Sequence, residues 1–314
     1  MKCLCCGKEI TKLEDQNSIS WHRSCLKQFF GSTAIPQLDI TPDELNRLVD
    51  ETVNSGFTIP GVQKKMSLCL STQGKNNRLT LVNYPAGYIL KPQSPEYRFL
   101  PELEYLVMSM AKITGINTVP FGLFPIGDEY AYITKRVDRD GIIKYAMEDF
   151  CQIEGRLTAD KYKGSYENCG RVITNHAKSI GLDMAELYLR LVFCYCVGNS
   201  DMHLKNFSLL EIESGKRIYK LSPAYDLLPV NLIIPTDKDE MALTLNGKKR
   251  NIRKKDFLAL AENYEIDDKV ANALIRKVLG CRDKYLELVG QVDIDDDMKE
   301  RFKILIMKRC GVLE

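Results

Sequence analysis

The chain has 314 residues, of which 45% are hydrophobic and 27% are charged, the composition of an ordinary globular protein with room for a sizeable core. Its 44 lysines and arginines against 42 aspartates and glutamates give a formal net charge of +2, so the overall charge predicts no affinity for nucleic acid or for an acidic membrane. No run of about 18 apolar residues can span a bilayer, and the first residues lack the apolar stretch of a secretion signal. We therefore expect a cytoplasmic protein with no membrane partner.

Two short pairs of potential metal ligands lie within residues 1–35. Cys3 and Cys6 form a C-x2-C pair, and His22 and Cys25 form an H-x2-C pair after a gap of fifteen residues. Together they supply the sulfur and nitrogen ligands of a tetrahedral Zn²⁺ site that is closed to substrate, so we expect a small zinc-knuckle module with a structural zinc. The alternative is a chance group of reduced cytosolic cysteines, because no further His or Cys pair reinforces the pattern.

Residues 36–138 are predicted to form a small β-rich lobe. After a linker at 36–40, a capping threonine, a proline and two acids predict a helix from Thr41 to about Val53. Strand-like runs separated by turn residues follow, and one helix from Pro101 to Thr114 interrupts them. The predicted strands are Met66–Leu70, Leu79–Val82, Tyr88–Lys91, Phe121–Phe124 and Tyr130–Thr134.

Residues 139–314 are predicted to form a mainly helical lobe. Apolar residues recur with a helical period in five segments, and strand-like residues return only in two short runs. The predicted helices are Tyr166–Ile180, Met184–Val197, Lys255–Asn263, Asp267–Leu279 and Asp296–Cys310, and the predicted strands are Phe207–Leu210 and Ile218–Leu221. A β-rich lobe followed by a helical lobe predicts an α+β fold.

The polar segment Asn199–Asn206 follows a very apolar predicted helix, so its side chains are presented at the end of a rigid element. Asp201 suits a catalytic base, Lys205 could neutralise a transferring phosphate, and Asn206 offers a carbonyl oxygen to Mg²⁺. Asp226 follows a predicted β-hairpin and offers a carboxylate to the same or a second Mg²⁺. An Asp-x4-Asn pair followed by a later Asp is the arrangement of kinase catalytic and metal loops.

Each of these residues has a simpler interpretation when it is taken singly. Asp201 could be an exposed loop acid and Asp226 a turn former, but their joint occurrence in kinase order favours phosphoryl transfer. His203 could itself be a general base. Its place two residues from Asp201 instead favours a role in orienting the loop.

Lys91 ends the third predicted strand, where its ammonium could bind the α- and β-phosphates of ATP. We expect a helix carboxylate to tether it. Glu102 and Glu104 both lie at the start of the predicted helix, and Glu104 is preferred as the partner. The favourable interaction of an acid with a helix N-terminus explains Glu102 at least as well.

Seven segments in this order resemble the HipA-type serine/threonine kinases, the toxins of bacterial toxin–antitoxin systems. They are Gly61-Val-Gln-Lys-Lys65, Ile89-Leu-Lys-Pro92, Pro101-Glu-Leu-Glu104, Lys135-Arg-Val-Asp-Arg139, Glu148-Asp-Phe-Cys-Gln152, Asn199-Ser-Asp-Met-His-Leu-Lys-Asn206 and Pro223-Ala-Tyr-Asp226. The resemblance covers about residues 55 to 310. It implies a two-lobed, protein-kinase-like fold, ATP and Mg²⁺ as cofactors, and the roles given above to Asp201, Asn206 and Asp226.

The resemblance also implies further contacts with ATP. The backbone of Lys135–Val137 would hold the nucleotide as a hinge. Gly61, Gln63 and Lys65 would lie in the loop over the phosphates, although this loop lacks a G-x-G-x-x-G pattern. Thr58 matches a serine that is autophosphorylated in the family and is expected to accept phosphate here. The alternative is an ordinary β-branched loop residue.

Partners are implied by the resemblance alone. They are a protein substrate such as an aminoacyl-tRNA synthetase or another translation component, and a DNA-binding HipB-like antitoxin through which any contact with DNA would be indirect. About 50 residues precede the resembling part, too few for the family's extra N-terminal domain, which in shorter HipT-like kinases is a separate small protein and is expected as a partner here. Glu148, Asp149 and Gln152 would support the site.

Two other functions stay open: a small-molecule kinase, and a catalytically weak module that binds partners. The basic run Lys248–Lys255 could bind an acidic partner or a nucleic-acid backbone, but such a run is more often a solvated loop. Labelling of protein by ATP would separate the kinase from the binding module.

Overall fold

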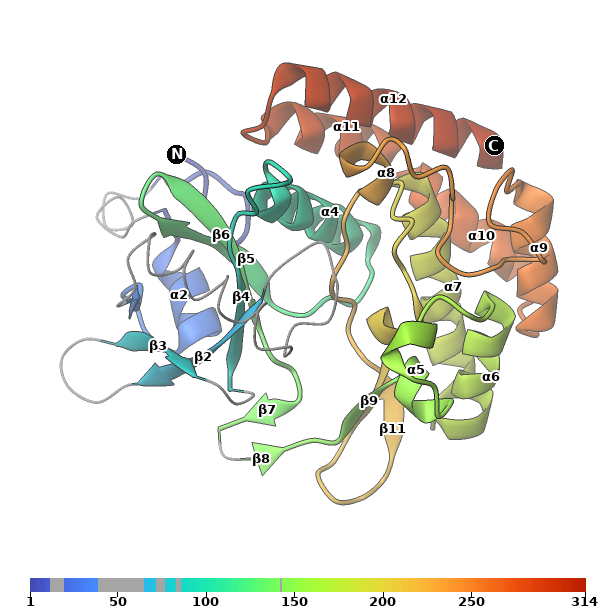
Figure 1. The fold of residues 1–314 in the computed structure, drawn as a ribbon, viewed down its shortest axis with the longest axis horizontal. Helices are drawn as coiled ribbons and strands as arrows, with labels where there is room; N and C mark the ends of the chain where they lie inside the picture. Colours follow the sequence, from blue (N-terminus) through green and yellow to red (C-terminus); the bar gives the residue numbers. More distant parts are fainter. Residues whose placement is uncertain (12–19, 39–64, 72–76, 83–85, 142) are drawn as a thin grey trace. The chain divides into compact units, whose positions relative to one another are not determined.

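The computed structural model describes residues 1–11, 20–38, 65–71, 77–82, 86–141 and 143–314. The chain forms two compact units (Figure 1). The first, here called the sheet unit, contains Met1–Tyr105 and Val119–Ile142, and the second, the helical unit, contains Leu106–Thr118 and Ile143–Glu314. The predicted helix at 41–53 lies outside the described residues, as do Thr58, Gly61 and Gln63.

A six-stranded sheet forms the centre of the sheet unit. Its strand order is β1-β3-β2-β4-β6-β5, and all neighbours are antiparallel except β1 and β3. The strands are β1 (Gln37–Leu38), β2 (Met66–Ser71), β3 (Arg78–Val82), β4 (Tyr88–Lys91), β5 (Phe121–Ile126) and β6 (Glu129–Lys135), and β7 (Arg139–Asp140) follows. The five predicted strands are confirmed within two residues at each end, but the expected linker contains the edge strand β1.

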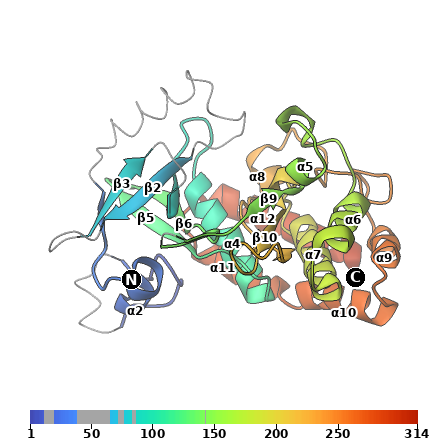
Figure 2. The ribbon, with the colours of Figure 1, turned by 90° about the horizontal axis from the view of Figure 1, so that it is seen from below.

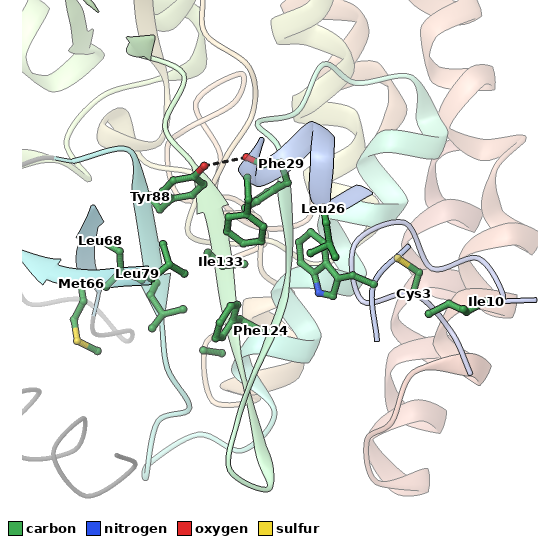
Figure 3. Packing of buried hydrophobic residues seen from close by; sticks show 14 residues of the cluster. Cys3, Ile10, Leu26, Phe29, Met66, Leu68, Leu79, Tyr88, Phe124 and Ile133 are labelled. Atoms are coloured by element: carbon green, nitrogen blue, oxygen red, sulfur yellow. Dashed lines mark hydrogen bonds between the residues drawn. The ribbon is translucent and has the colours of Figure 1, made fainter. Parts of the chain in front are cut away.

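The N-terminal residues share their core with this sheet. Helix α2 (Arg23–Phe30) brings Phe29 and Phe30 against Tyr88 of β4, whose hydroxyl donates to the Phe29 carbonyl at 3.0 Å (Figure 3). The fully buried Trp21 donates from Nε1 to the Leu123 carbonyl at 2.9 Å. A side chain at Gly122 would lie 2.5 Å from the Trp21 ring, so close packing requires glycine there. The described residues of the N-terminal segment 1–35 therefore pack on the sheet and share a buried core with it.

The helical unit is built around α7 (Ile180–Cys196), which packs against its neighbours α6, α10 and α12 (Figure 2). Every residue of α7 from Leu187 onward is buried, as expected of a helix at the centre of a bundle. The other helices are α5 (Phe150–Ile153), α6 (Tyr166–His176), α8 (Val230–Ile233), α9 (Lys254–Asn263), α10 (Asp268–Leu279), α11 (Arg282–Gln291) and α12 (Asp296–Leu313). Helix α4 (Leu100–Thr114) begins in the sheet unit and ends in this one.

A small antiparallel sheet completes the helical unit. Its order is β11-β10-β9, with β9 at Met147–Asp149, β10 at Ser208–Glu211 and β11 at Tyr219–Leu221, and β8 spans Ile143–Lys144. The predicted helix over 166–180 is wrong at its end, because Ala177 is extended and bridges to Tyr219. Helices α2 and α11 and strand β9 were not predicted. In the described part of the chain, no helix is both long and apolar enough to cross a membrane.

Candidate active site and metal cluster

A sharp turn after α7 presents the polar loop Asn199–Asn206. Gly198 makes this turn with φ +70°, a conformation that favours glycine. A side chain there would also lie 2.6 Å from Leu305 of α12. The backbone conformation therefore favours glycine at the entrance to the loop, and a larger residue would also displace the Leu305 side chain.

Hydrogen bonds within the loop fix its path. The Asp201 carbonyl accepts from the His203 backbone N–H and from Asn206 Nδ2, both at 2.8 Å, and the Asp201 N–H donates to Asn199 Oδ1 at 3.2 Å. Asn206 uses its amide nitrogen in this bond, so its Oδ1 is the side-chain atom that could coordinate a cation. The loop thus orients both Asp201 and Asn206 through the same carbonyl group.

The Asp201 carboxylate meets a hydroxyl. Tyr162, in the segment between α5 and α6, donates from its hydroxyl to Asp201 Oδ1 at 2.5 Å. Burial raises the pKa of Asp201, the Tyr162 hydrogen bond and the Lys161 charge lower it, and the charges of Asp226 and Asp237 raise it again; the net shift is upward. A carboxylate with a raised pKa is a stronger base than an exposed one, which suits proton removal from an alcohol.

His203 is 5% exposed, and burial, assisted by the Lys161 charge, lowers its pKa to about 4. The imidazole is therefore neutral near pH 7, and its weak basicity does not suit a general base. Its ring lies edge-on to that of Tyr162, with 4.9 Å between the centroids. These contacts support the predicted role of His203 in shaping the loop.

Lys205 is held by an acid that lies far away in sequence. Its Nζ donates to Asp149 Oδ2 at 2.7 Å, and the carboxylate of Asp149 also caps α5 by accepting from the Gln152 backbone N–H at 2.8 Å. Gln152 Oε1 in turn accepts from the Asp149 N–H at 3.0 Å, and Asp149 pairs with Ser208 across β9 and β10. Asp149 and Gln152, which were expected to support the site, thus hold the Lys205 ammonium in place. The sequence position of Lys205 did not indicate this partner.

Asp226 has a left-handed backbone, with φ +55°. A residue other than glycine rarely adopts this conformation unless its surroundings enforce it, and such residues cluster at functional sites. Here the preceding Tyr225 is anchored by hydrogen bonds of its hydroxyl with Ser208 Oγ at 2.5 Å and with the Lys205 carbonyl at 3.1 Å. The same loop that carries Lys205 and Asn206 therefore fixes the approach to Asp226.

Asn231, at the start of α8, connects the loop to α12. Its backbone N–H donates to the Gly198 carbonyl at 3.0 Å, and its Nδ2 donates to Ser200 Oγ at 3.1 Å. Ser200 Oγ donates to Asp237 Oδ2 at 2.7 Å, and Arg309 of α12 donates to Asn231 Oδ1 at 3.1 Å. No spacing pattern in the sequence pointed to this network, because its members belong to four separate segments.

The sheet unit carries the buried ion pair Lys91–Glu104. Lys91 Nζ lies 2.6 Å from Glu104 Oε1, and the two residues are 4% and 0% exposed. The lysine ammonium also lies 5.4 Å from the centre of the Tyr132 ring on β6. The choice of Glu104 over Glu102 as the partner agrees with this geometry, and the pair holds the lysine at the end of β4.

The segment predicted as a nucleotide hinge follows β6. The Lys135 N–H donates to the Pro120 carbonyl at 3.0 Å and the Arg136 N–H to the Gly87 carbonyl at 2.9 Å, so both are part of the sheet's hydrogen bonding. Asp138 is buried and accepts two hydrogen bonds from Arg136, each of 2.8 Å. This ion pair fixes the chain beyond Val137.

Of the residues predicted for the loop over the phosphates, Lys65 is described and is exposed just before β2.

The four predicted zinc ligands converge. The ligand atoms of Cys3, Cys6, His22 and Cys25 all lie within 4.8 Å of one another, and tetrahedral Zn–S bonds of 2.3 Å would place neighbouring sulfurs about 3.8 Å apart. His22 Nδ1 is 3.3 Å from Cys6 Sγ, and its Nε2 is 3.1 Å from the Glu9 carbonyl. A carbonyl at the second ring nitrogen is the usual support of a metal-bound histidine. The donor set fits a closed, structural Zn²⁺ site.

Residues 57–284 match the model of the HipA-like C-terminal domain. The chain belongs to this family. It is 34% identical over 253 residues to the putative kinase Y4dM of Sinorhizobium fredii, covering 74% of this chain and 60% of the relative. It is 31% identical over 191 residues to a putative kinase of Haemophilus influenzae, covering 56% and 53%. It is 24% identical over 197 residues to the serine/threonine-protein kinase toxin HipA of Shewanella oneidensis, covering 56% of this chain and 44% of the relative.

The chain therefore spans at most about three fifths of the length of these relatives. Among solved structures, the Shewanella oneidensis HipA in complex with HipB and operator DNA superposes with a TM-score of 0.69 at 18% identity, covering 81% of this chain and 64% of the other. The Helicobacter pylori proinflammatory kinase CtkA gives a TM-score of 0.53 at 17% identity, covering 78% and 93%. Both similarities confirm the kinase-like α+β fold of this HipA-family member.

Proposed function

We propose that this protein is an ATP- and Mg²⁺-dependent serine/threonine kinase and the toxin of a toxin–antitoxin module. The observation that carries the proposal is the contact between Asp201 and a hydroxyl. The half-buried carboxylate of Asp201, on a loop held by its own hydrogen bonds, accepts a short O–H hydrogen bond, which is the geometry a general base needs to take a proton from an alcohol. Membership of the HipA-like family supports it.

The remaining residues take the roles that phosphoryl transfer requires. Asn206 and Asp226 would hold Mg²⁺, which when bound neutralises phosphate charge; their amide and carboxylate oxygens are the ligands this ion prefers. Lys205 would neutralise the transferring phosphate, and Asp149 keeps its ammonium in place. Lys91, held by Glu104, would bind the α- and β-phosphates.

Further proposed contacts rest on the family resemblance. The Lys135–Val137 backbone would bind the nucleotide, and Gly61, Gln63 and Lys65 would line the loop over its phosphates. Thr58 would be a site of autophosphorylation. Zn²⁺ at the Cys/His cluster would be structural, since all four positions are filled by the protein.

The proposed partners follow from the relatives. A HipB-like antitoxin is proposed because the Shewanella HipA structure is a complex with HipB and operator DNA, and a small separate N-terminal protein is a further candidate. A translation component such as an aminoacyl-tRNA synthetase is the proposed substrate.

Transfer from γ-labelled ATP tests the function. We expect the wild-type protein to label itself or a protein of a bacterial lysate, and the Asp201→Asn variant to be about 10²- to 10⁴-fold slower, the usual contribution of a general base. Asp297→Asn, an exposed acid at the start of α12, is the matched control and should behave as wild type. No label on any protein would contradict the proposal, and ATP consumption with label only on a small molecule would favour a small-molecule kinase.

A further inference from the structure

The segment between α5 and α6 carries Tyr162 to the catalytic loop. A short 3-10 helix at Thr158–Asp160 precedes this tyrosine, and the Leu204 N–H of the loop donates to the Lys161 carbonyl at 3.2 Å. On the other side, Arg156 donates to the Lys163 carbonyl at 2.8 Å. Hydrogen bonds to the backbone carbonyls of Lys161 and Lys163, from the Leu204 N–H and the Arg156 guanidinium, therefore hold the chain on both sides of Tyr162.

Among the described residues, three tyrosine hydroxyls bond to this loop, and they differ in their acceptors. Tyr166 donates to the Met202 carbonyl at 3.0 Å and Tyr225 to the Lys205 carbonyl at 3.1 Å, and burial raises the pKa of both phenols. Tyr162 donates to the Asp201 carboxylate itself. Its side chain is also 43% exposed, whereas Tyr166 is fully buried. Of these three tyrosines, Tyr162 alone bonds to the candidate base, and it is an exposed residue.

This contact places a phenolic oxygen where an acceptor alcohol must lie. A substrate hydroxyl has to donate its hydrogen bond to the base before it attacks the γ-phosphate, and Tyr162 already does so at 2.5 Å. Burial and the neighbouring carboxylate raise the pKa of Tyr162, so the phenol keeps its proton until a base removes it.

We propose that Tyr162 is a phosphate acceptor within its own chain and that its modification uncovers Asp201 for other substrates. If the protein is the kinase proposed above, the Tyr162 oxygen forms a bond to the γ-phosphorus of ATP while the bond from that phosphorus to the β-phosphate oxygen breaks. ADP leaves with the electron pair of that bond, and the phenolic proton passes to Asp201 Oδ1. Atoms and charge balance with ATP as the only co-reactant.

Charge explains why the modified residue would leave the base. A tyrosine phosphate carries about −1.5 to −2 charges near pH 7, and Asp226 and Asp237 already add negative charge around Asp201. Repulsion would drive the phosphate away from these acids. The ammonium of the adjacent Lys161 lies 5.0 Å from the Tyr162 ring centre and offers a positive charge to the phosphate. The carboxylate would then be free to accept a substrate hydroxyl.

Mass spectrometry of the full-length protein tests the proposal. After incubation with ATP and Mg²⁺, cleavage after glutamate gives the peptide 155–167, which contains Thr158, Tyr162, Ser165 and Tyr166. We expect fragment spectra to place phosphate on Tyr162 in the wild type and in Tyr219→Phe, a control tyrosine in β11. We expect loss of this phosphopeptide in Tyr162→Phe and in Asp201→Asn.

Two further readouts complete the test. Labelling of a lysate protein should show a lag in the wild type that Tyr162→Phe abolishes, because that variant leaves Asp201 without its phenolic cover. An isotope-heavy Asp201→Asn chain mixed with the light wild type should stay unmodified at Tyr162, since the transfer is within one chain.

Phosphate on the heavy chain, or only on the other hydroxyls of the peptide, would overturn the proposal, and so would an unmodified Tyr162 in a preparation that labels other proteins. If the wild type labels nothing at all, the proposed function fails and this inference fails with it.

Discussion

In the sheet unit, Cys3, Cys6, His22 and Cys25 turn their ligand atoms toward one another, and His22 is further supported by the Glu9 carbonyl. In the helical unit, the loop Asn199–Asn206 satisfies its backbone through internal bonds and turns the Asp201 carboxylate to a half-exposed phenol. A closed set of ligands suits a structural role, because nothing further can bind.

In contrast, a carboxylate that is held by a loop and accepts a hydrogen bond from the hydroxyl of an exposed tyrosine suits a catalytic role. The two regions should therefore respond differently to substitution. Changes in the cluster should alter stability, and changes at the loop should alter rate while the fold is kept.

The largest effect on stability is expected at the Cys/His cluster. Binding of a structural Zn²⁺ contributes about 10–16 kcal/mol in small zinc domains, as much as the whole stability of a typical domain, about 5–15 kcal/mol. Cys6→Ser should therefore lose the metal and unfold the core shared by Trp21, Phe29 and the sheet. Elemental analysis and thermal unfolding measure both changes.

Cys5→Ser is the control for this substitution, because Cys5 lies between two of the ligands but outside the four-atom cluster. It should retain the metal and the wild-type unfolding temperature. A metal-free wild type that is as stable as the zinc-loaded protein would contradict a structural zinc.

The next largest effect is expected at the ion pair Lys91–Glu104, which is buried like a structural element and also carries a proposed phosphate-binding group. Removing one member of a buried ion pair usually costs about 3–5 kcal/mol, so Glu104→Gln should lower the unfolding free energy by that amount, measured by urea unfolding. The exposed Glu129 on β6 supplies the control Glu129→Gln.

Lys91→Met distinguishes the structural part of this pair from the functional one. If Lys91 binds phosphates, the variant loses ATP binding even under conditions in which it is fully folded. A folded Lys91→Met protein with wild-type affinity for ATP would limit the pair to a structural role.

A smaller effect is expected at Asn231, which connects the loop to α12. Asn231→Ala removes the bonds from Nδ2 to Ser200 and from Arg309 to Oδ1, and unsatisfied buried groups cost about 1–3 kcal/mol. We expect kcat to fall about tenfold, equivalent to about 1.4 kcal/mol, with little change in the KM for ATP.

The half-buried Asn272 on α10, whose amide donates only to the Asp268 carbonyl of its own helix, gives the control Asn272→Ala, which should leave kcat unchanged. An Asn231→Ala protein that is destabilised but has wild-type kcat would show that the network supports folding alone and does not position Asp201.

Local patterns were sufficient to predict most of the fold. The strands β2 to β6 and the helices α4, α7, α9, α10 and α12 have clear periodicities and were predicted at about their observed positions, although α7 begins four residues before its predicted start and α12 ends three residues after its predicted end. Two misses have physical causes. Helix α11 has exposed charges and few buried residues, and strand β9 has only three residues and is defined by its pairing with β10.

The candidate site was only partly predictable for a related reason. Asp201, Asn206 and Asp226 lie in a recognisable order, but the partners that position them are brought together by the tertiary fold. Asp149 reaches Lys205 across β9 and β10, and Tyr162 reaches Asp201 from a loop that has no motif of its own. Contacts between distant segments leave no spacing pattern in one sequence.

The smallest effect is expected in the basic run Lys248–Lys255, three of whose six cations bond to other groups of the protein. Lys248 bonds to the buried Asp256 at 2.7 Å, Arg250 to Asp239 at 2.6 Å, and Lys254 to the Glu314 carbonyl at 3.0 Å. The Arg250 side chain is 62% exposed, and exposed ion pairs contribute about 0–1 kcal/mol. Arg250→Ala should therefore change the unfolding free energy by less than about 1 kcal/mol.

Lys248→Ala should lower the free energy of unfolding more than Arg250→Ala does, because the carboxylate of Asp256 is buried and loses its cation. Neither variant should change retention on an immobilised polyanion over a salt gradient, since cations bonded to the protein's own acids are poorly available to a partner. A marked drop in retention for Arg250→Ala alone would instead assign this run to a partner surface, and would place a second functional region in the helical unit besides the Asp201 loop.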